Sequence, residues 1–216
     1  MKSLNQYIQE KLVINKNYND YMIAPKSFDE LRKIIEDRYD KLGPGTKQDP
    51  IDFNDIDVSN LNSFCNIGKG IFDNTKFKYI DISGWDVSNI ESMRNMFYGC
   101  EKLKSVGDIS NWDVSSVTNM SQMFFGCKYF NQDISKWDVS NVTDMSHMFF
   151  GCESFNQDLS SWDVSSVTRM SRMFSGCHSF NKDISNWNVS KVMNWMYRMS
   201  MFDGCPIKEE YKPKFK

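Results

Sequence analysis

Alanine and leucine are scarce in this sequence, although both are usually common in globular proteins. Methionine, phenylalanine and tryptophan are abundant instead, so a specific pattern must govern the choice of apolar side chains. No apolar run approaches the roughly 20 residues of a membrane-spanning helix, which argues against membrane insertion. The opening residues, MKSLNQYIQE, lack the continuous apolar core of a secretory signal peptide, so the sequence predicts no export of the chain.

The net charge is small, and the sequence lacks the common catalytic motifs. The formal net charge is −2, which gives no general attraction to nucleic acid or to anionic membranes. The sequence contains no phosphate-binding loop, no nucleophile elbow, no HExxH zinc motif and no CxxC pair. We therefore expect neither an enzyme nor a cofactor or metal site, and no residue is a candidate for catalysis.

What the sequence has is an internal repeat. Five copies begin with Trp-Asp-Val-Ser or, in the last, Trp-Asn-Val-Ser, and each runs through a Met-rich stretch to Phe-x-Gly-Cys. Their tryptophans are separated by 27, 25, 25 and 25 residues: Trp85, Trp112, Trp137, Trp162 and Trp187. A degenerate copy, 56–64, precedes the array, and the final copy carries three extra residues around Trp195. Atypical end coils are expected of a solenoid, because its end faces would otherwise expose the core.

Within one coil the sequence predicts a short helix and a short strand. Apolar positions of the cleanest copy recur at helical spacing: Val142, Met145, Met148 and Phe149. Ser140 is placed to cap this helix and Gly151 to end it. The return segment, 155–162, alternates apolar and polar residues, and such strands would pair in parallel from coil to coil. The predicted fold is an α/β, leucine-rich-repeat-like solenoid with short parallel strands and one short helix per coil.

The N-terminal region follows a different pattern. One helix is predicted by apolar residues that share a face: Leu4, Ile8 and Leu12. A second is predicted by the capping box at 27–30, with a stop at Gly43 and Pro44. We expect these helices to cap the first coil. The predicted domains are a helical cap region, 1–55, a repeat solenoid, 56–205, and a C-terminal tail, 206–216.

The repeat F-N-Q-D-I/L-S-x-W-D-V-S-x-V-T-x-M-S-x-M-F-x-G-C resembles the BspA-like leucine-rich repeats of bacterial surface proteins, over about 60% of the chain. The resemblance implies adhesion or protein binding and carries over no catalytic residue. Unlike the surface members, this sequence shows no signal peptide, lipobox or long stalk. Display on the cell surface is therefore not expected, and the chain should be cytoplasmic in the producing cell or associated with a virion.

The first ten residues support an alternative origin. They are similar to the head-targeting peptides of tailed-phage internal proteins, which end in an apolar-x-Glu cleavage site, here Ile8-Gln-Glu10. On this alternative the chain is a phage head-associated or injected protein.

The cysteines and histidines have structural interpretations. Five of the six cysteines share one repeat position, which favours a column of buried, reduced thiols over disulfides: Cys100, Cys127, Cys152, Cys177 and Cys205. His147 and His178 fall at variable positions of the repeat, which is typical of exposed surface residues.

Two aspartate columns leave two interpretations open: Asp86, Asp113, Asp138 and Asp163 in one, and Asp81, Asp108, Asp133, Asp158 and Asp183 in the other. A calcium ladder would make the chain a calcium-stabilised adhesin. In the favoured interpretation each carboxylate accepts backbone N–H bonds in its own turn. Asn188, which ends the first column, could form the same turn without the charge.

Positions that vary between coils are the candidates for partner binding. Three aromatic residues directly precede the glycine of consecutive coils and should align: Tyr98, Phe125 and Phe150. Charged or polar candidates occupy neighbouring variable positions: His147, Arg169 and Arg172, and Lys136 on the strand side. An exposed apolar stripe is costly unless it is covered, and aromatic and arginine side chains are enriched in interface hot spots. The sequence therefore predicts a noncatalytic scaffold that binds an unidentified protein and no nucleic acid, in an oligomeric state that stays open. The alternative is that these rings complete the core.

Overall fold

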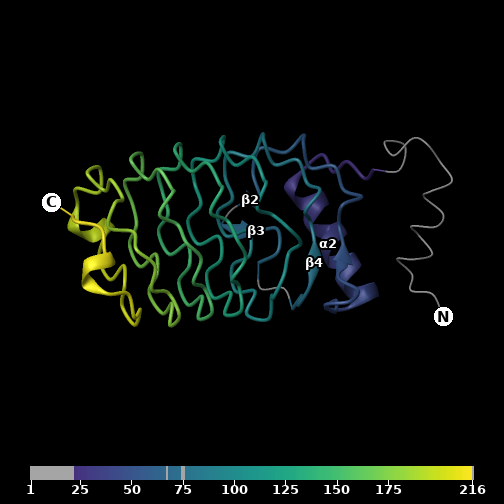
Figure 1. The fold of residues 1–216 in the computed structure, drawn as a ribbon. Coiled ribbons are helices and arrows are strands. Elements are labelled where there is room, and N and C mark those ends of the chain that lie inside the picture. The colour runs from purple at the N-terminus through teal and green to yellow at the C-terminus, as the bar shows by residue number, and fades with distance from the viewer. Residues whose placement is uncertain (1–21, 67, 74–75, 216) are drawn as a thin grey trace.

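The computed structural model describes residues 22–66, 68–73 and 76–215. Over these residues the chain winds into successive coils that stack side by side, from a helix at one end to the C-terminal segment at the other (Figure 1). The helix predicted from Leu4, Ile8 and Leu12 and the candidate targeting peptide, 1–10, lie outside the described residues.

The helix α2 (Phe28–Leu42) forms where the capping box predicts it. The Ser27 side chain accepts a hydrogen bond from the Glu30 N–H, and the Glu30 carboxylate accepts one from the Lys26 N–H. The helix ends at Gly43, where a φ of 75° suits a residue without a Cβ. None of the helices that the structure describes is long and apolar enough to cross a membrane.

One face of α2 packs on the first coils. Leu31 and Ile35 are buried in the common core. Arg38 donates two hydrogen bonds, 2.6 and 2.9 Å long, to the carboxylate of Asp55, and its guanidinium lies 5.0 Å from the centre of the Phe53 ring. The predicted capping role of this second helix agrees with these contacts.

Pairing between coils is parallel, as predicted, but it lies elsewhere in the coil. β1 (Ile51–Asp52) pairs with β4 (Ile80–Asp81), whereas β2 (Cys65–Asn66) and β3 (Lys69–Gly70) form an antiparallel pair. Later coils are joined by single parallel bridges that run along the stack through Ser63, Ser92, Asn119, Asp144 and Arg169. These bridges fall in the segment that the sequence predicts to be helical.

The prediction of one helix per coil is wrong for the described residues, because the segment 140–152 consists of turns. Three turns follow one another, closed by the N–H groups of Met148, Phe150 and Cys152, each donating to the carbonyl three residues earlier. The alternate N–H groups leave the coil: those of Met145 and His147 donate to carbonyls of the next coil. A helix would have used every one of these donors internally.

The predicted caps have other roles in these turns. The Ser140 N–H donates to the Asp138 carboxylate at 3.0 Å, so this serine caps no helix. Gly151 has a φ of 68°, and its N–H donates to Ser175 in the next coil. The positive φ thus aims a donor along the stack axis.

The return segment is not a strand among the described residues, although the sequence predicts one at 155–162. Side-chain amides join neighbouring coils there instead. The Asn156 N–H donates to the side-chain oxygen of Asn131, and the Asn181 N–H donates to that of Asn156. This asparagine ladder replaces a backbone ladder.

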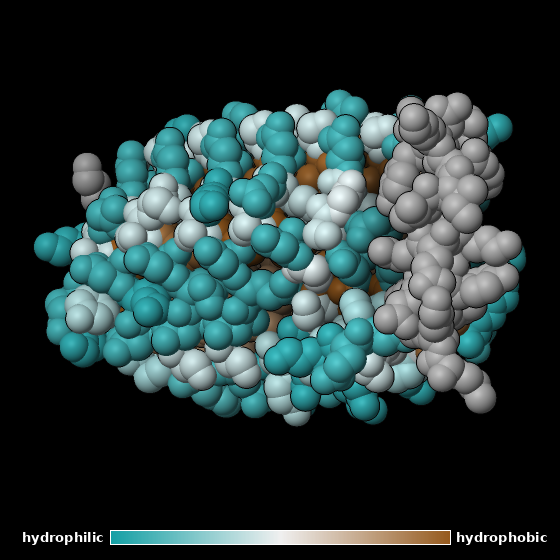
Figure 2. Space-filling view, turned by 45° about the vertical axis from the view of Figure 1, so that its right-hand side comes forward, coloured by the Kyte–Doolittle hydropathy of each residue, from teal (hydrophilic) through white to brown (hydrophobic). Residues whose placement is uncertain are grey.

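Columns of identical residues fill the interior. Phenylalanine rings of successive coils stack with their centres 5.4 to 5.8 Å apart: Phe97, Phe124, Phe149 and Phe174. Four indole N–H groups donate to a carbonyl of the preceding coil at 2.9 to 3.1 Å: Trp85, Trp137, Trp162 and Trp187. Outside this core, hydrophilic side chains form rows over much of the face shown in Figure 2. Every coil therefore exposes the same few columns of side chains to solvent.

Candidate interaction surface

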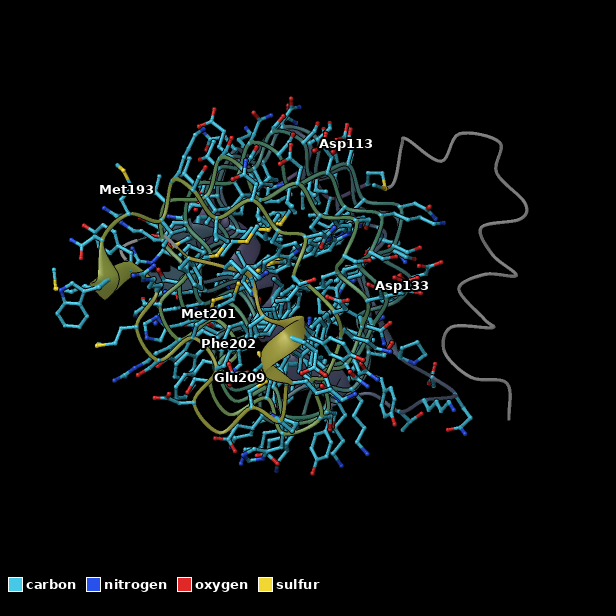
Figure 3. The ribbon with its side chains drawn as sticks, turned by 60° about the vertical axis from the view of Figure 1, so that its left-hand side comes forward. Asp113, Asp133, Met193, Met201, Phe202 and Glu209 are labelled. Carbon is cyan, nitrogen blue, oxygen red and sulfur yellow. The ribbon has the colours of Figure 1, made fainter. Side chains whose placement is uncertain are left out.

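The aspartate columns are part of the turn geometry. Asp113 and Asp133 lie on the outside of the coils (Figure 3), and each accepts a hydrogen bond from the N–H of the serine two residues later, at 3.1 and 2.9 Å. The serine side chains and N–H groups hold the pKa of both carboxyls below its usual value. Asn188 accepts the equivalent bond from Ser190 at 3.2 Å. The predicted backbone role of these residues is confirmed.

The described residues offer no ready metal site. No three His, Cys, Asp or Glu side chains converge in this part of the chain as a metal ion would require. Whether the aspartate columns bind calcium therefore stays a prediction to be tested.

The cysteine column is buried and reduced. Cys100, Cys127, Cys152 and Cys177 are buried in the core and form no disulfide. Each Sγ donates to a phenylalanine carbonyl of the preceding coil, for example Cys152 to Phe124 at 3.0 Å. Burial raises the pKa of the Cys152 and Cys177 thiols far above its usual value. Cys205 lies in the same column, half-buried. Such thiols are poor nucleophiles, because the reactive species is the thiolate.

The three aromatic residues before the glycines align, as predicted. The ring centres of Tyr98 and Phe125 are 4.6 Å apart, and those of Phe125 and Phe150 are also 4.6 Å apart. All three rings are half-buried. Their alignment follows from the turns, because each occupies the same place in its coil and its N–H closes the same turn. The next coil has Ser175 at this place, so the stripe ends there.

A second column lies beside this stripe with strained backbone. Asn95, Gln122, His147, Arg172 and Ser200 share one repeat position, and each has a φ between 53° and 58°. A positive φ is unfavourable for residues with a Cβ. In Asn95, Gln122, His147 and Arg172 it accompanies an N–H that donates to the next coil, and Ser200 of the last coil keeps the same conformation.

His147 connects the two columns. Its ring centre lies 6.4 Å from that of Phe125 and 6.0 Å from that of Phe150. Burial, and then the charge of Arg172, lower the pKa of His147. The imidazole is consequently neutral at physiological pH, and it adds a further ring to the aromatic stripe.

The remaining predicted residues divide into two places. Arg169 is exposed, pairs with Asp144 at 3.5 Å and lies 5.3 Å from the centre of the Tyr197 ring. Lys136 lies instead near Asp108 and Asp133, on which its charge acts. The structure thus brings His147 and Arg172 to the aromatic stripe and Arg169 to the adjacent bridge column, whereas Lys136 belongs to the aspartate side.

Sequence analysis missed a group of exposed apolar side chains in the last coil. The three extra residues there form part of a loop with the short helix η2 (Trp195–Tyr197). Five apolar residues of this loop are 37 to 84% exposed: Met193, Trp195, Met196, Tyr197 and Met199. The sequence could have indicated this exposure, because the core of a regular coil has no space for three inserted residues that include apolar side chains.

A family model described as "Mycoplasma protein of unknown function, DUF285" matches residues 48–107, 65–167 and 103–210. The matched ranges overlap along the array, as expected for a repeat protein, and together span most of the chain. No curated protein and no solved structure matches the chain.

Proposed function

We propose that this chain, which belongs to the DUF285 family, is a noncatalytic repeat scaffold that binds a protein partner. We further propose that its coils are of the BspA-like leucine-rich-repeat kind, on the strength of the repeat motif and the parallel stacking. The binding surface is the aromatic stripe of Tyr98, Phe125 and Phe150 together with His147 and Arg172. Below, these five residues are called the stripe surface.

The observation that carries the proposal is the partly exposed stack of rings formed by Tyr98, Phe125 and Phe150. A core column, such as that of Phe124 and Phe149, is fully buried, whereas Phe125 and Phe150 stack with the same regularity and stay partly in solvent. Rings fixed by stacking lose little further freedom when a partner covers them. Arg172, next to them, supplies donors of the kind enriched in hot spots.

The chemistry of the other side chains supports a noncatalytic role. Burial raises the pKa of the Cys127, Cys152 and Cys177 thiols, which makes them poor nucleophiles. His147 stands among phenylalanine rings, and the nearby Asp144 already pairs with Arg169. In the described part of the chain, His147 and the column thiols therefore do not form the pair of base and nucleophile that covalent catalysis would require.

The test is the double substitution Phe125→Ser plus Phe150→Ser, which copies Ser175 of the next coil. We expect the variant to lose capture of the partner that wild-type protein enriches from the native source, measured by quantitative mass spectrometry. Each lost ring stack is worth about 1 kcal/mol, so the melting temperature should fall by only several degrees.

Tyr129→Ser is the matched control, because Tyr129 is also aromatic and 52% exposed but lies outside the stripe surface, beside Lys104. This control should keep both stability and capture. Equal capture by the double variant and the wild type would refute the assignment of the surface. Collapse of the fold would instead place the rings in the core.

A further inference from the structure

Neighbouring coils are joined by a regular row of backbone hydrogen bonds, and this row has no counterpart at the last coil. In the coil before it, alternate N–H groups of Met170, Arg172, Phe174 and Gly176 donate to the carbonyls of residues 197, 199, 201 and 203. The same four positions donate in the preceding coils. Each coil therefore presents a row of donors, two residues apart, to the coil that follows.

In the last coil this row is open. Ser200 corresponds to Arg172, since the two φ angles are 56° and 53°, and Gly204 corresponds to Gly176, with 68° and 74°. The N–H groups of Ser200, Phe202 and Gly204 donate to no acceptor in the described part of the chain. We call these three groups the terminal donor row.

Exposed apolar side chains lie in the same coil. Trp195 is 62% exposed and Met199 is 41% exposed, although a regular coil buries such residues. In Figure 3, Met193 lies at the rim of the stack and points away from it. Met201 and Phe202 lie nearer the middle, beside η3 (Glu209–Tyr211). The C-terminal segment joins the coil below it through the bond from the Ile184 N–H to the Tyr211 carbonyl. The segment also reaches over this coil: the Lys212 ammonium lies 5.5 Å from the centre of the Phe202 ring, and the Arg198 guanidinium lies 5.2 Å from the centre of the Phe215 ring. Within the described residues its backbone accepts no bond from the terminal donor row.

We propose that the last coil binds a peptide segment of a partner protein, which takes up the turns of a regular coil and pairs in parallel with the terminal donor row. Carbonyls of alternate peptide residues accept from Ser200, Phe202 and Gly204, as the next coil does everywhere else in the stack. Apolar side chains of the peptide cover Trp195 and Met199. This mode is comparable to strand addition at a sheet edge, in which backbone bonds supply affinity and side-chain contacts supply selectivity.

A second copy of the chain does not fit this edge equally well. Two last coils placed edge to edge would present donors to donors, so neither row would find acceptors. At the other end of the stack, Ile23 already forms a parallel bridge with Ile56, beside α2. The occupant must therefore bring free carbonyls of its own, which a peptide segment of a partner protein does.

The probe is a peptide copy of the segment that accepts hydrogen bonds from such a donor row inside the stack. A synthetic peptide with the sequence of residues 168–176, Thr-Arg-Met-Ser-Arg-Met-Phe-Ser-Gly, contains the carbonyls that accept from the coil before it. Amide exchange of the whole protein is followed by nuclear magnetic resonance with and without peptide. In free protein the terminal donor row should exchange rapidly, while the N–H groups of Arg172, Phe174 and Gly176 are protected. Peptide should slow exchange of the terminal donor row by about tenfold or more.

Two controls distinguish backbone pairing from nonspecific hydrophobic binding. The same peptide made of D-amino acids has the same apolar content but cannot form the parallel pairing, so it should not protect the row. Trp195→Ser plus Met199→Ser should weaken binding of the L-peptide about tenfold while keeping the melting temperature, because Trp195 is 62% and Met199 41% exposed. Tyr129→Ser should bind as the wild type does.

Several results would overturn the proposal: protection of the three amides in the free monomer, no binding of the L-peptide, or equal binding of the D-peptide. Protection that appears only as protein concentration rises, together with a dimer mass in sedimentation, would assign the edge to a second copy instead. The inference stands apart from the stripe surface. Accordingly, Phe125→Ser plus Phe150→Ser should bind the peptide normally, whichever way the capture experiment ends.

Discussion

Single residues in the cysteine column link stability to alkaline pH. Burial raises the pKa of the Cys127, Cys152 and Cys177 thiols well above its usual value. In the unfolded chain the same thiols ionise near pH 9, so between this value and the folded pKa only the folded state keeps the protons. Their contribution is complete below about pH 9 and is lost progressively as the pH rises above it.

We therefore predict that the free energy of unfolding falls above about pH 9, by about 1.4 kcal/mol per pH unit for each such thiol. Chemical denaturation between pH 8 and pH 10.5 measures the slope. Cys152→Ala is the control: it lowers stability at every pH but should make the alkaline slope shallower by one thiol. Lysine and tyrosine ionisation affects both proteins alike, so an unchanged slope would contradict the assignment. Denatured protein kept without reductant should also titrate as six free thiols.

At the scale of the coil, one tryptophan departs from its column. The coil between Trp85 and Trp112 has two extra residues, which lie between Cys100 and Asp108. The Trp112 indole N–H is buried without a hydrogen-bond partner among the described residues. In the next coil, Trp137 donates to the Ile109 carbonyl at 2.9 Å. The coil with two extra residues is thus the one whose tryptophan lacks the indole hydrogen bond to the preceding coil.

The two tryptophans form a matched pair for substitution. Trp112→Phe and Trp137→Phe remove similar volume, but only the second breaks a hydrogen bond, and the first removes an unpaired buried donor. We predict that Trp137→Phe destabilises the protein more than Trp112→Phe does, by about 1 to 2 kcal/mol. Urea unfolding of both variants and the wild type measures the difference. Equal costs would mean that a water molecule already serves the Trp112 N–H.

The sequence predicts which residues of a coil are inside better than it predicts the element that holds them. Val142, Met145, Met148 and Phe149 are all buried, as expected from their spacing. A series of three-residue turns buries positions three and four apart just as a helix does, so periodicity alone cannot separate the two. The deciding factor is the neighbouring coil, which takes every second N–H. A pattern within one coil does not contain that information.

The same reasoning explains what could be predicted of the candidate surfaces. Tyr98, Phe125 and Phe150 were expected to align because identical coils place identical positions in register, and this needs no knowledge of the element type. The exposure of Trp195 and Met199 was not predicted, since it depends on how three inserted residues leave the core. The open donors of Ser200, Phe202 and Gly204 are properties of an end and appear only once the stacking is known.

Over the whole molecule, the aspartates form the longest columns of like charge. Each carboxylate accepts bonds from the serine two residues later, and in Asp113 a single oxygen, Oδ1, accepts both the N–H and the hydroxyl of Ser115. Asn188 shows that the turn does not need the charge. Calcium requires six to eight oxygen ligands, so several coils would have to contribute jointly to bind it.

We predict that the columns serve the turns alone, so that millimolar calcium and EDTA leave the melting temperature of the protein unchanged. Bound calcium at a hundredfold excess over its Kd would add about 2.7 kcal/mol to the free energy of unfolding, a shift that calorimetry detects readily. Asp133→Asn plus Asp158→Asn provides the control, because both substitutions keep an acceptor in the turn, as Asn188 does, and remove two charges from one column. The variant and the wild type should melt alike with and without calcium. The prediction would be contradicted if calcium stabilised the wild type but not this variant. Such a result would support a calcium-stabilised adhesin, because the two proteins differ only in the charged carboxylates that could bind calcium.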